Sequence, residues 1–212
     1  MNRIARSPTP RRVVFAALAG AIVGCASAPA PAPVPTGNLN APAPISPQTR
    51  AEFDEAMQLI GAGNYEKGME LLRRVASQSQ NNAVPHINLA IVNMKKGKLD
   101  DAENNLKKAL EIDPDNPVAN NELGILYRKT GRFAEARTTY EKLLGKYPRY
   151  PVANKNLAIL CDLYLRDYEC ALRGYTAYSN ALPDDKNARI WMADVHKRLG
   201  TDPRAATVGN EP

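Results

Sequence analysis

The chain has 212 residues, of which 44% are hydrophobic, with 28 basic and 22 acidic side chains and a formal net charge of +6. This length suits one domain with a sizeable core, or a short repeat array with flanking segments. The positive charge does not indicate nucleic-acid binding, because four arginines precede Cys25 in a stretch without acids, and without these four, 24 basic residues face 22 acidic ones.

The N-terminal segment has the features of an export signal. An apolar run from Val13 to Gly24 follows the arginines, and about a dozen apolar residues are too few to span a bilayer but fit a signal peptide. The residues from Ile22 to Cys25 resemble the bacterial lipobox. The resemblance implies that residues 1–24 are a lipoprotein signal peptide and that the mature chain begins at a lipidated Cys25.

The residues after Cys25 bear on the membrane that would hold the chain. Ala26 and Ser27 follow it, with no aspartate, and by the rule known for such lipoproteins this implies the outer membrane of a Gram-negative bacterium, facing the periplasm. Two or three acyl chains would make a stable anchor. Two alternatives stay open: a secretory peptide cleaved near the alanines after Cys25, and a twin-arginine signal at Arg11 and Arg12.

Residues 25–45 are rich in alanine and proline and have few side chains able to build a core. Such a segment is typical of an extended, semi-rigid linker. At about 3.1 Å per residue in the polyproline conformation, it would hold a domain up to roughly 70 Å from the lipid. A disordered spacer without a selected length is the alternative.

From Ser46 onward the pattern is helical. Ser46 is a good N-cap and Pro47 suits the first helical position, so a first helix is predicted from there toward Gly61, and its partner after Asn64. Gly63 and its counterparts Gly97 and Gly131 suit tight turns between helices. The later helices are predicted at 83–96, 99–112, 117–130, 133–146 and 186–199.

The third helix pair carries a repeated pattern: Leu123, Gly124, Tyr127, Ala136, Tyr140 and Pro148. Moved back by 34 residues, the pattern falls on Leu89, Ala90, Ala102 and Pro114. The spacing resembles the tetratricopeptide repeat. In that reading Gly124 meets Ala136 where the two helices approach most closely.

The resemblance implies an all-α superhelix of about four helix pairs with a C-terminal capping helix. The domain would cover residues 46–200, with repeats at about 49–82, 83–116, 117–150 and 151–185, a capping helix at 186–200 and a disordered tail at 201–212. Arg189, Asp194, Lys197 and Arg198 would give the cap its polar outer face. In the fourth repeat Tyr168 and Ala171 arrive one residue late, so one residue is expected to be inserted in its turn.

Cys161 and Cys170 lie almost symmetrically about the turn near Leu165 and Arg166. The hairpin should bring them opposite each other, within the 4.4 to 6.8 Å between Cα atoms that a disulfide requires, and an exported protein enters an oxidising compartment. A disulfide is therefore expected, and two buried free thiols are the alternative.

No set of residues resembles a catalytic centre or a metal site, and no cofactor or small-molecule substrate is expected. The two histidines, His86 and His196, have no cysteine or carboxylate at ligand spacing. Core packing is the better interpretation of both. Gly61 and Gly63 lack the following lysine and threonine of a phosphate-binding loop.

A repeat array offers a concave surface built by the first helix of each repeat. Transfer of the family's groove positions, residue by residue, gives the candidate peptide-binding residues Asn88, Ile91, Lys95, Asn121, Ile125, Arg128, Lys129, Lys155, Asn156 and Ile159. Asn88 and Asn156 hold the position that forms an asparagine ladder in some relatives, where amides grip a peptide backbone. Glu122 interrupts the ladder here, and solvated polar side chains are the alternative.

The favoured hypothesis is a lipid-anchored periplasmic adaptor that binds an extended segment of another envelope protein. Relatives with this layout suggest pilus assembly, outer-membrane biogenesis, cell-wall enzyme regulation or a TonB-type system. Two alternatives remain: a structural spacer between outer membrane and cell wall without a peptide ligand, and a cytoplasmic chaperone-like adaptor whose N-terminus is not a signal.

Overall fold

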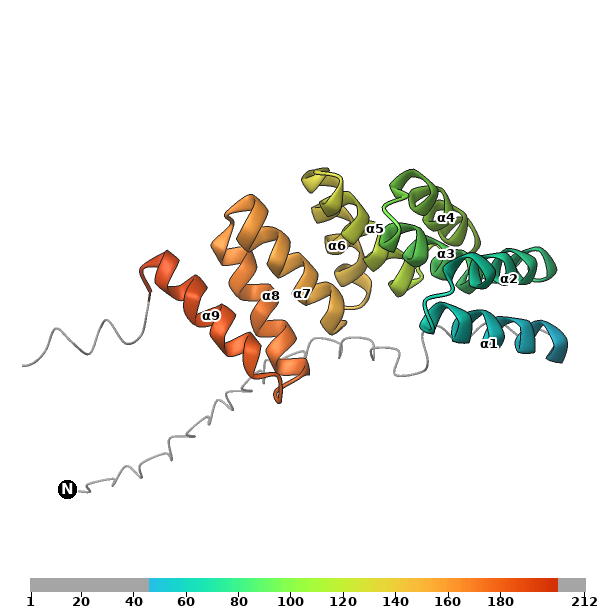
Figure 1. The fold of residues 1–212 in the computed structure, drawn as a ribbon. Coiled ribbons are helices and arrows are strands. Elements are labelled where there is room, and N and C mark those ends of the chain that lie inside the picture. Colours follow the sequence, from blue (N-terminus) through green and yellow to red (C-terminus); the bar gives the residue numbers. More distant parts are fainter. Residues whose placement is uncertain (1–45, 202–212) are drawn as a thin grey trace, which may run out of the picture. The chain divides into compact units, whose positions relative to one another are not determined.

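The computed structural model describes residues 46–201 (Figure 1). The proposed signal peptide, Cys25, the whole linker and the tail after Thr201 lie outside the described residues. Within the described range the elements are α1 (Pro47–Gly61), α2 (Tyr65–Gln78), α3 (Val84–Lys95), α4 (Leu99–Ile112), α5 (Pro117–Lys129), α6 (Phe133–Lys146), α7 (Pro151–Ile159), the π-helical η1 (Leu160–Leu165), α8 (Tyr168–Ala181) and α9 (Lys186–Leu199). No helix in this range is both long and apolar enough to span a membrane.

The helices pack as consecutive antiparallel pairs, and each pair lies against the next (Figure 1). The first helices also touch across repeats, since α3 contacts α5 and α5 contacts α7. Neither helix of a pair can bury its apolar stripe alone, and the buried residues form successive clusters along the array. The side lined by α1, α3, α5 and α7 is called the inner face below.

The predicted start of the first helix and the glycine turns of the first three repeats are confirmed. The Ser46 side chain accepts a hydrogen bond from the Thr49 amide at 3.1 Å, so it caps α1 as expected. Gly63, Gly97 and Gly131 have φ values of 83°, 73° and 75°. A side chain at these turns would strain the backbone, which explains why glycine recurs at this position.

The space beside Gly124 is filled by the ring of Tyr140. A Cβ atom added at Gly124 would lie 2.5 Å from Cε1 of Tyr140, and the Tyr140 side chain is fully buried. The absent side chain therefore makes room for the Tyr140 ring. Ala136 is also fully buried, in the same core cluster as Tyr140.

The extra residue of the fourth repeat does not lie in the turn, as the sequence suggested, but in the helix before it. Arg166 takes the left-handed conformation (φ 53°) that glycines take in the earlier repeats, and α8 begins two residues later, as α6 begins two residues after Gly131. The π-helical turn of η1 absorbs the added residue, because it places more residues per turn than an α-helix.

Cys161 and Cys170 form a disulfide in this hairpin, with Cα atoms 5.8 Å apart. The neighbouring Asp162 is buried, accepts a hydrogen bond from Tyr175 Oη at 3.3 Å and forms an ion pair with Arg198 of α9. The disulfide hairpin is thus tied to the last helix. Arg198 is one of the residues expected to give the cap a polar outer face, and it also packs inward.

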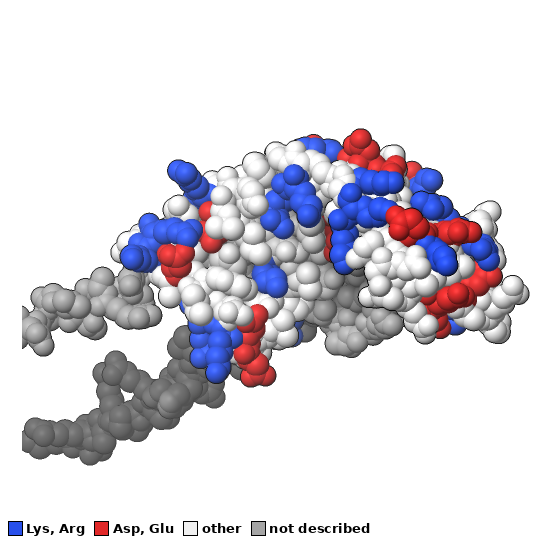
Figure 2. Space-filling model, viewed as in Figure 1, with Lys and Arg blue, Asp and Glu red and all other residues white. Residues whose placement is uncertain are grey.

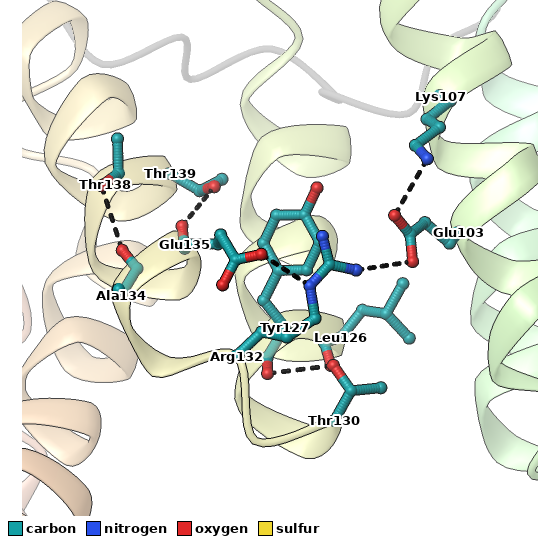
Figure 3. A network of polar contacts seen from close by, with 10 residues as sticks. All are labelled: Glu103, Lys107, Leu126, Tyr127, Thr130, Arg132, Ala134, Glu135, Thr138 and Thr139. Atoms are coloured by element: carbon teal, nitrogen blue, oxygen red, sulfur yellow. Dashed lines mark hydrogen bonds and ion pairs between the residues drawn. The ribbon is translucent and has the colours of Figure 1, made fainter.

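Ion pairs connect successive repeats at the ends of the second helices (Figure 3). Arg132 lies over the Tyr127 ring and contacts Glu103 of α4 and Glu135 of α6, each at 2.8 Å. Lys107 contacts the same Glu103 at 3.0 Å. The pair formed by Arg137 and Asp167, and that formed by Lys96 and Glu66, link other neighbouring repeats in the same way.

Candidate functional site

Four basic side chains predicted for the groove project from the inner helices. Lys95 closes α3, and Arg128 and Lys129 close α5, whereas Lys155 lies in the first half of α7. The structure therefore brings the first three toward one end of the inner face and places Lys155 nearer the other. None of the four forms an ion pair within residues 46–201.

Aromatic rings support three of these cations. Lys95 lies 5.0 Å from the centroid of the Tyr65 ring, and Lys155 lies 5.2 Å from that of Tyr178. Arg128 lies over Tyr164, 5.6 Å from its centroid, and its buried Nε has no hydrogen-bond partner within the described residues. A ring holds a cation in place without neutralising it, so the charges remain available to an acidic ligand.

The asparagines of the inner face form hydrogen bonds within the protein. The Asn88 amide donates to the Val84 carbonyl of its own helix at 2.9 Å. Asn156 Nδ2 donates to Asn121 Oδ1 at 2.9 Å, and both side chains are buried. These bonds fix the helices, and they leave the amides less free to grip a peptide backbone.

The aliphatic positions differ in exposure. Ile91 is 37% exposed, whereas Ile125 and Ile159 are half-buried and pack against the core. Ile91 and the aliphatic stem of Lys95 therefore offer the more open apolar contact on this face.

Glu122, the residue that interrupts the ladder, is half-buried beside Asn121, whose amide donates to its carboxylate at 3.2 Å. Burial raises the pKa of Glu122 above its ordinary value of 4.5, and the hydrogen bond from Asn121 only partly opposes this shift. Burial thus disfavours the negative form of this carboxylate.

Glu122→Gln is expected to stabilise the protein at neutral pH. Between the unfolded and the folded pKa of Glu122, the folded state keeps a proton on this carboxylate that the unfolded state has released. Wild-type stability therefore falls as the pH rises from about 4.5 through the folded pKa. The variant lacks this loss, so its urea midpoint should exceed that of the wild type at pH 7 and approach it at pH 4. Glu55→Gln, at an exposed position on α1, is the control and should show no such divergence.

Two features of the structure could not be predicted from the sequence: the aromatic partners of the cations and an exposed apolar site in η1. Leu163 and Tyr164, in the π-helical turn, are 61% and 43% exposed, and Tyr164 stacks on Phe133 with ring centroids 5.0 Å apart. The one-residue delay in the fourth repeat was the available signal, but it does not tell where the extra residue goes.

One cluster of potential metal ligands is present among residues 46–201. The sulfur atoms of Cys161 and Cys170 and a carboxylate oxygen of Asp167 lie within 4.8 Å of one another. Because the two sulfur atoms are bonded to each other, neither is a thiolate able to ligate a metal. Asp167 instead caps α8 by accepting from the Cys170 amide at 3.1 Å.

Comparison with known families identifies the repeat. The family model described as "Tetratricopeptide repeat" matches residues 59–107 and 93–160. These ranges cover the helices that build most of the inner face. Proteins with such repeats are typically non-catalytic scaffolds for protein–protein interaction.

Solved structures match the fold at low sequence identity. PilF of Pseudomonas aeruginosa is 20% identical, with a TM-score of 0.65, over 71% of this chain and 68% of PilF. MamA of Desulfovibrio magneticus RS-1 is 16% identical, with a TM-score of 0.64, over 77% of this chain and 92% of that one. MamA of AMB-1 is 20% identical, with a TM-score of 0.58, over 74% of this chain and 86% of that one. Among curated proteins no significant match exists. These likenesses establish an all-α superhelix of this repeat type.

Proposed function

We propose, from the tetratricopeptide repeats that this chain contains, that it is an adaptor whose inner face binds an extended, acidic segment of another protein. The single observation that carries the proposal is a row of cations at the ends of α3 and α5, Lys95, Arg128 and Lys129, none of which forms an ion pair within residues 46–201. By contrast, Arg132 and Arg137 pair with carboxylates of neighbouring helices and repeats.

The ligand's chemistry follows from this arrangement. An acidic segment would gain ion pairs with cations that already lie in place over aromatic rings, so little side-chain entropy is lost on binding. The exposed Ile91 offers an apolar contact beside Lys95. The buried pair of Asn121 and Asn156 argues that charge, rather than an asparagine ladder, supplies most of the recognition.

The cell envelope is the proposed place of action. The apolar run and the lipobox-like residues ending at Cys25 support lipid anchoring, and the absence of aspartate after Cys25 favours the outer membrane, facing the periplasm. The partner would then be another envelope protein. Mass spectrometry of the chain from its host tests this part: a lipidated N-terminal Cys25 is expected, and retention of Met1 would overturn it.

Crosslinking and pull-down from native membranes test the binding function. The triple variant Lys95→Glu, Arg128→Glu and Lys129→Glu is expected to lose at least about tenfold of the captured partner, because several charge-assisted contacts disappear together.

The matched control reverses three exposed cations away from the inner face that form no ion pair within the described part of the chain: Lys67, Lys142 and Arg149. It has the same net charge as the triple variant and should capture the partner as the wild type does. Equal capture by the triple variant and the wild type would refute the inner face as the binding site.

A further inference from the structure

A second candidate site lies away from the groove residues, between the first two repeats. A solvent-open cavity of about 430 Å³ is lined by three helices, each of which contributes three residues at helical spacing. It falls in the size range of small-ligand sites. Its α3 residues are His86, Leu89 and Asn93, none of which is a groove residue, so the cavity is distinct from the proposed protein-binding site.

The walls of this α2–α4 cavity are positively charged. Arg73 of α2 and Lys108 of α4 line it, with Asp101 as its single acidic residue. Both cations are exposed, and neither forms an ion pair with another residue in the described range. Figure 2 shows charged side chains of both signs gathered over α2–α4. The cavity therefore presents two free cations on two of its walls.

The inner part of the cavity carries polar groups with unused bonding capacity. Asn93 is 3% exposed, and its Oδ1 has no hydrogen-bond partner within the described residues. His86 Nδ1 donates to Asn105 Oδ1 at 3.4 Å, and burial lowers the pKa of the His86 imidazole below its ordinary value of 6.5. The ring is therefore neutral at pH 7. A buried, unpartnered amide is costly for stability alone, which points to a role in binding.

Leu89 supplies an apolar surface between these groups. The two cations, the polar side chains and this leucine together suit a ligand with a negatively charged end, polar atoms and a short aliphatic part. A carboxylate is planar and accepts two hydrogen bonds from a guanidinium at once, which matches Arg73 better than a single-point contact would.

We propose that the α2–α4 cavity binds a carboxylate between Arg73 and Lys108, with Asn93 and His86 contacting the remainder of the ligand. The carboxylate belongs either to the C-terminal residue of a polypeptide or to a free small organic acid. Its site does not involve the inner face, so the two functions are independent of each other.

Proton NMR of the full-length chain tests this site directly, because the chain has only two histidines. His86 lines the cavity, whereas His196 lies on α9 and contacts Thr201, so its ring signal is an internal control. The probes are glutarate, a short peptide ending in leucine with a free carboxylate, and the same peptide with a C-terminal amide. Sodium chloride keeps the ionic strength constant, at pH 7.5.

The His86 ring signal is expected to shift saturably with at least one carboxylate probe while the His196 signal stays. The variant Arg73→Gln with Lys108→Gln should weaken this binding at least about tenfold. The control, Arg74→Gln with Lys107→Gln, removes neighbouring charges on the same helices that do not line the cavity, and it should bind as the wild type does.

The probes also identify the source of the carboxylate. A shift with the acid peptide that is stronger than with glutarate and absent with the amide assigns the site to a polypeptide C-terminus, and a stronger shift with glutarate assigns it to a free acid. The proposal is overturned if no carboxylate probe moves the His86 signal, if His86 and His196 shift alike, or if the Arg73 and Lys108 variant binds unchanged.

Discussion

Replacing Cys161 and Cys170 together with alanine is expected to lower the free energy of unfolding by about 2 to 4 kcal/mol. The disulfide joins residues nine positions apart, and the loop-entropy account assigns roughly 2 to 3 kcal/mol to a ring of this size. Both side chains are nearly or fully buried, so their truncation adds a small packing loss. Urea unfolding followed by circular dichroism measures the effect.

Reduction of the wild-type chain separates the bond from the packing. With a reducing agent, the unfolding curve should move most of the way toward that of the double alanine variant, because reduction removes the bond and leaves the sulfur atoms. Coincident curves for the oxidised and reduced wild type would show that the disulfide does not stabilise this hairpin.

Gly124→Ala is expected to lower the free energy of unfolding by about 1 to 3 kcal/mol, despite the better helix propensity of alanine. The added Cβ would lie 2.5 Å from the Tyr140 ring, and this ring is fully buried, so it can move only by displacing its neighbours in the core. Thermal or urea unfolding measures the loss. The loss would come from steric overlap with the Tyr140 ring. A smaller side chain at position 140 should therefore relieve it.

Two further variants make this prediction specific. Gly145→Ala adds a methyl group to α6 where nothing lies within 4 Å, and it should stabilise by roughly 0.5 to 1 kcal/mol. In a Tyr140→Leu background, Gly124→Ala should cost much less than in the wild type, as expected for two residues in contact. An equal cost in both backgrounds would contradict the overlap.

The repeat fold could be predicted from the sequence because the pattern is local. Leucine, small residues and proline recur 34 positions apart, and each Gly turn and the Ser46 cap concern contacts within a few residues. Three predicted helices have the same bounds as those observed, namely 99–112, 133–146 and 186–199. The π-helical turn could not be placed, because an extra residue can enter a helix or a turn with the same effect on spacing.

The site was harder to predict because its chemistry depends on contacts between repeats. Asn121 and Asn156 look like separate groove residues in the sequence, but they pair with each other in the structure. His86 looked like a core residue, whereas it is half-buried and lines a cavity. Such contacts are set by how successive helix pairs stack, which no single repeat encodes.

Site-specific photocrosslinking tests most directly the central claim that the inner face binds a protein partner. A benzophenone amino acid would replace Ile91 on the inner face, or Lys142 on the exposed side of α6, and the cells would then be irradiated. A discrete crosslinked product is expected from position 91, lost when Arg128 and Lys129 are changed to glutamate, and none from position 142. The same product from both positions, or a product only from position 142, would contradict the account.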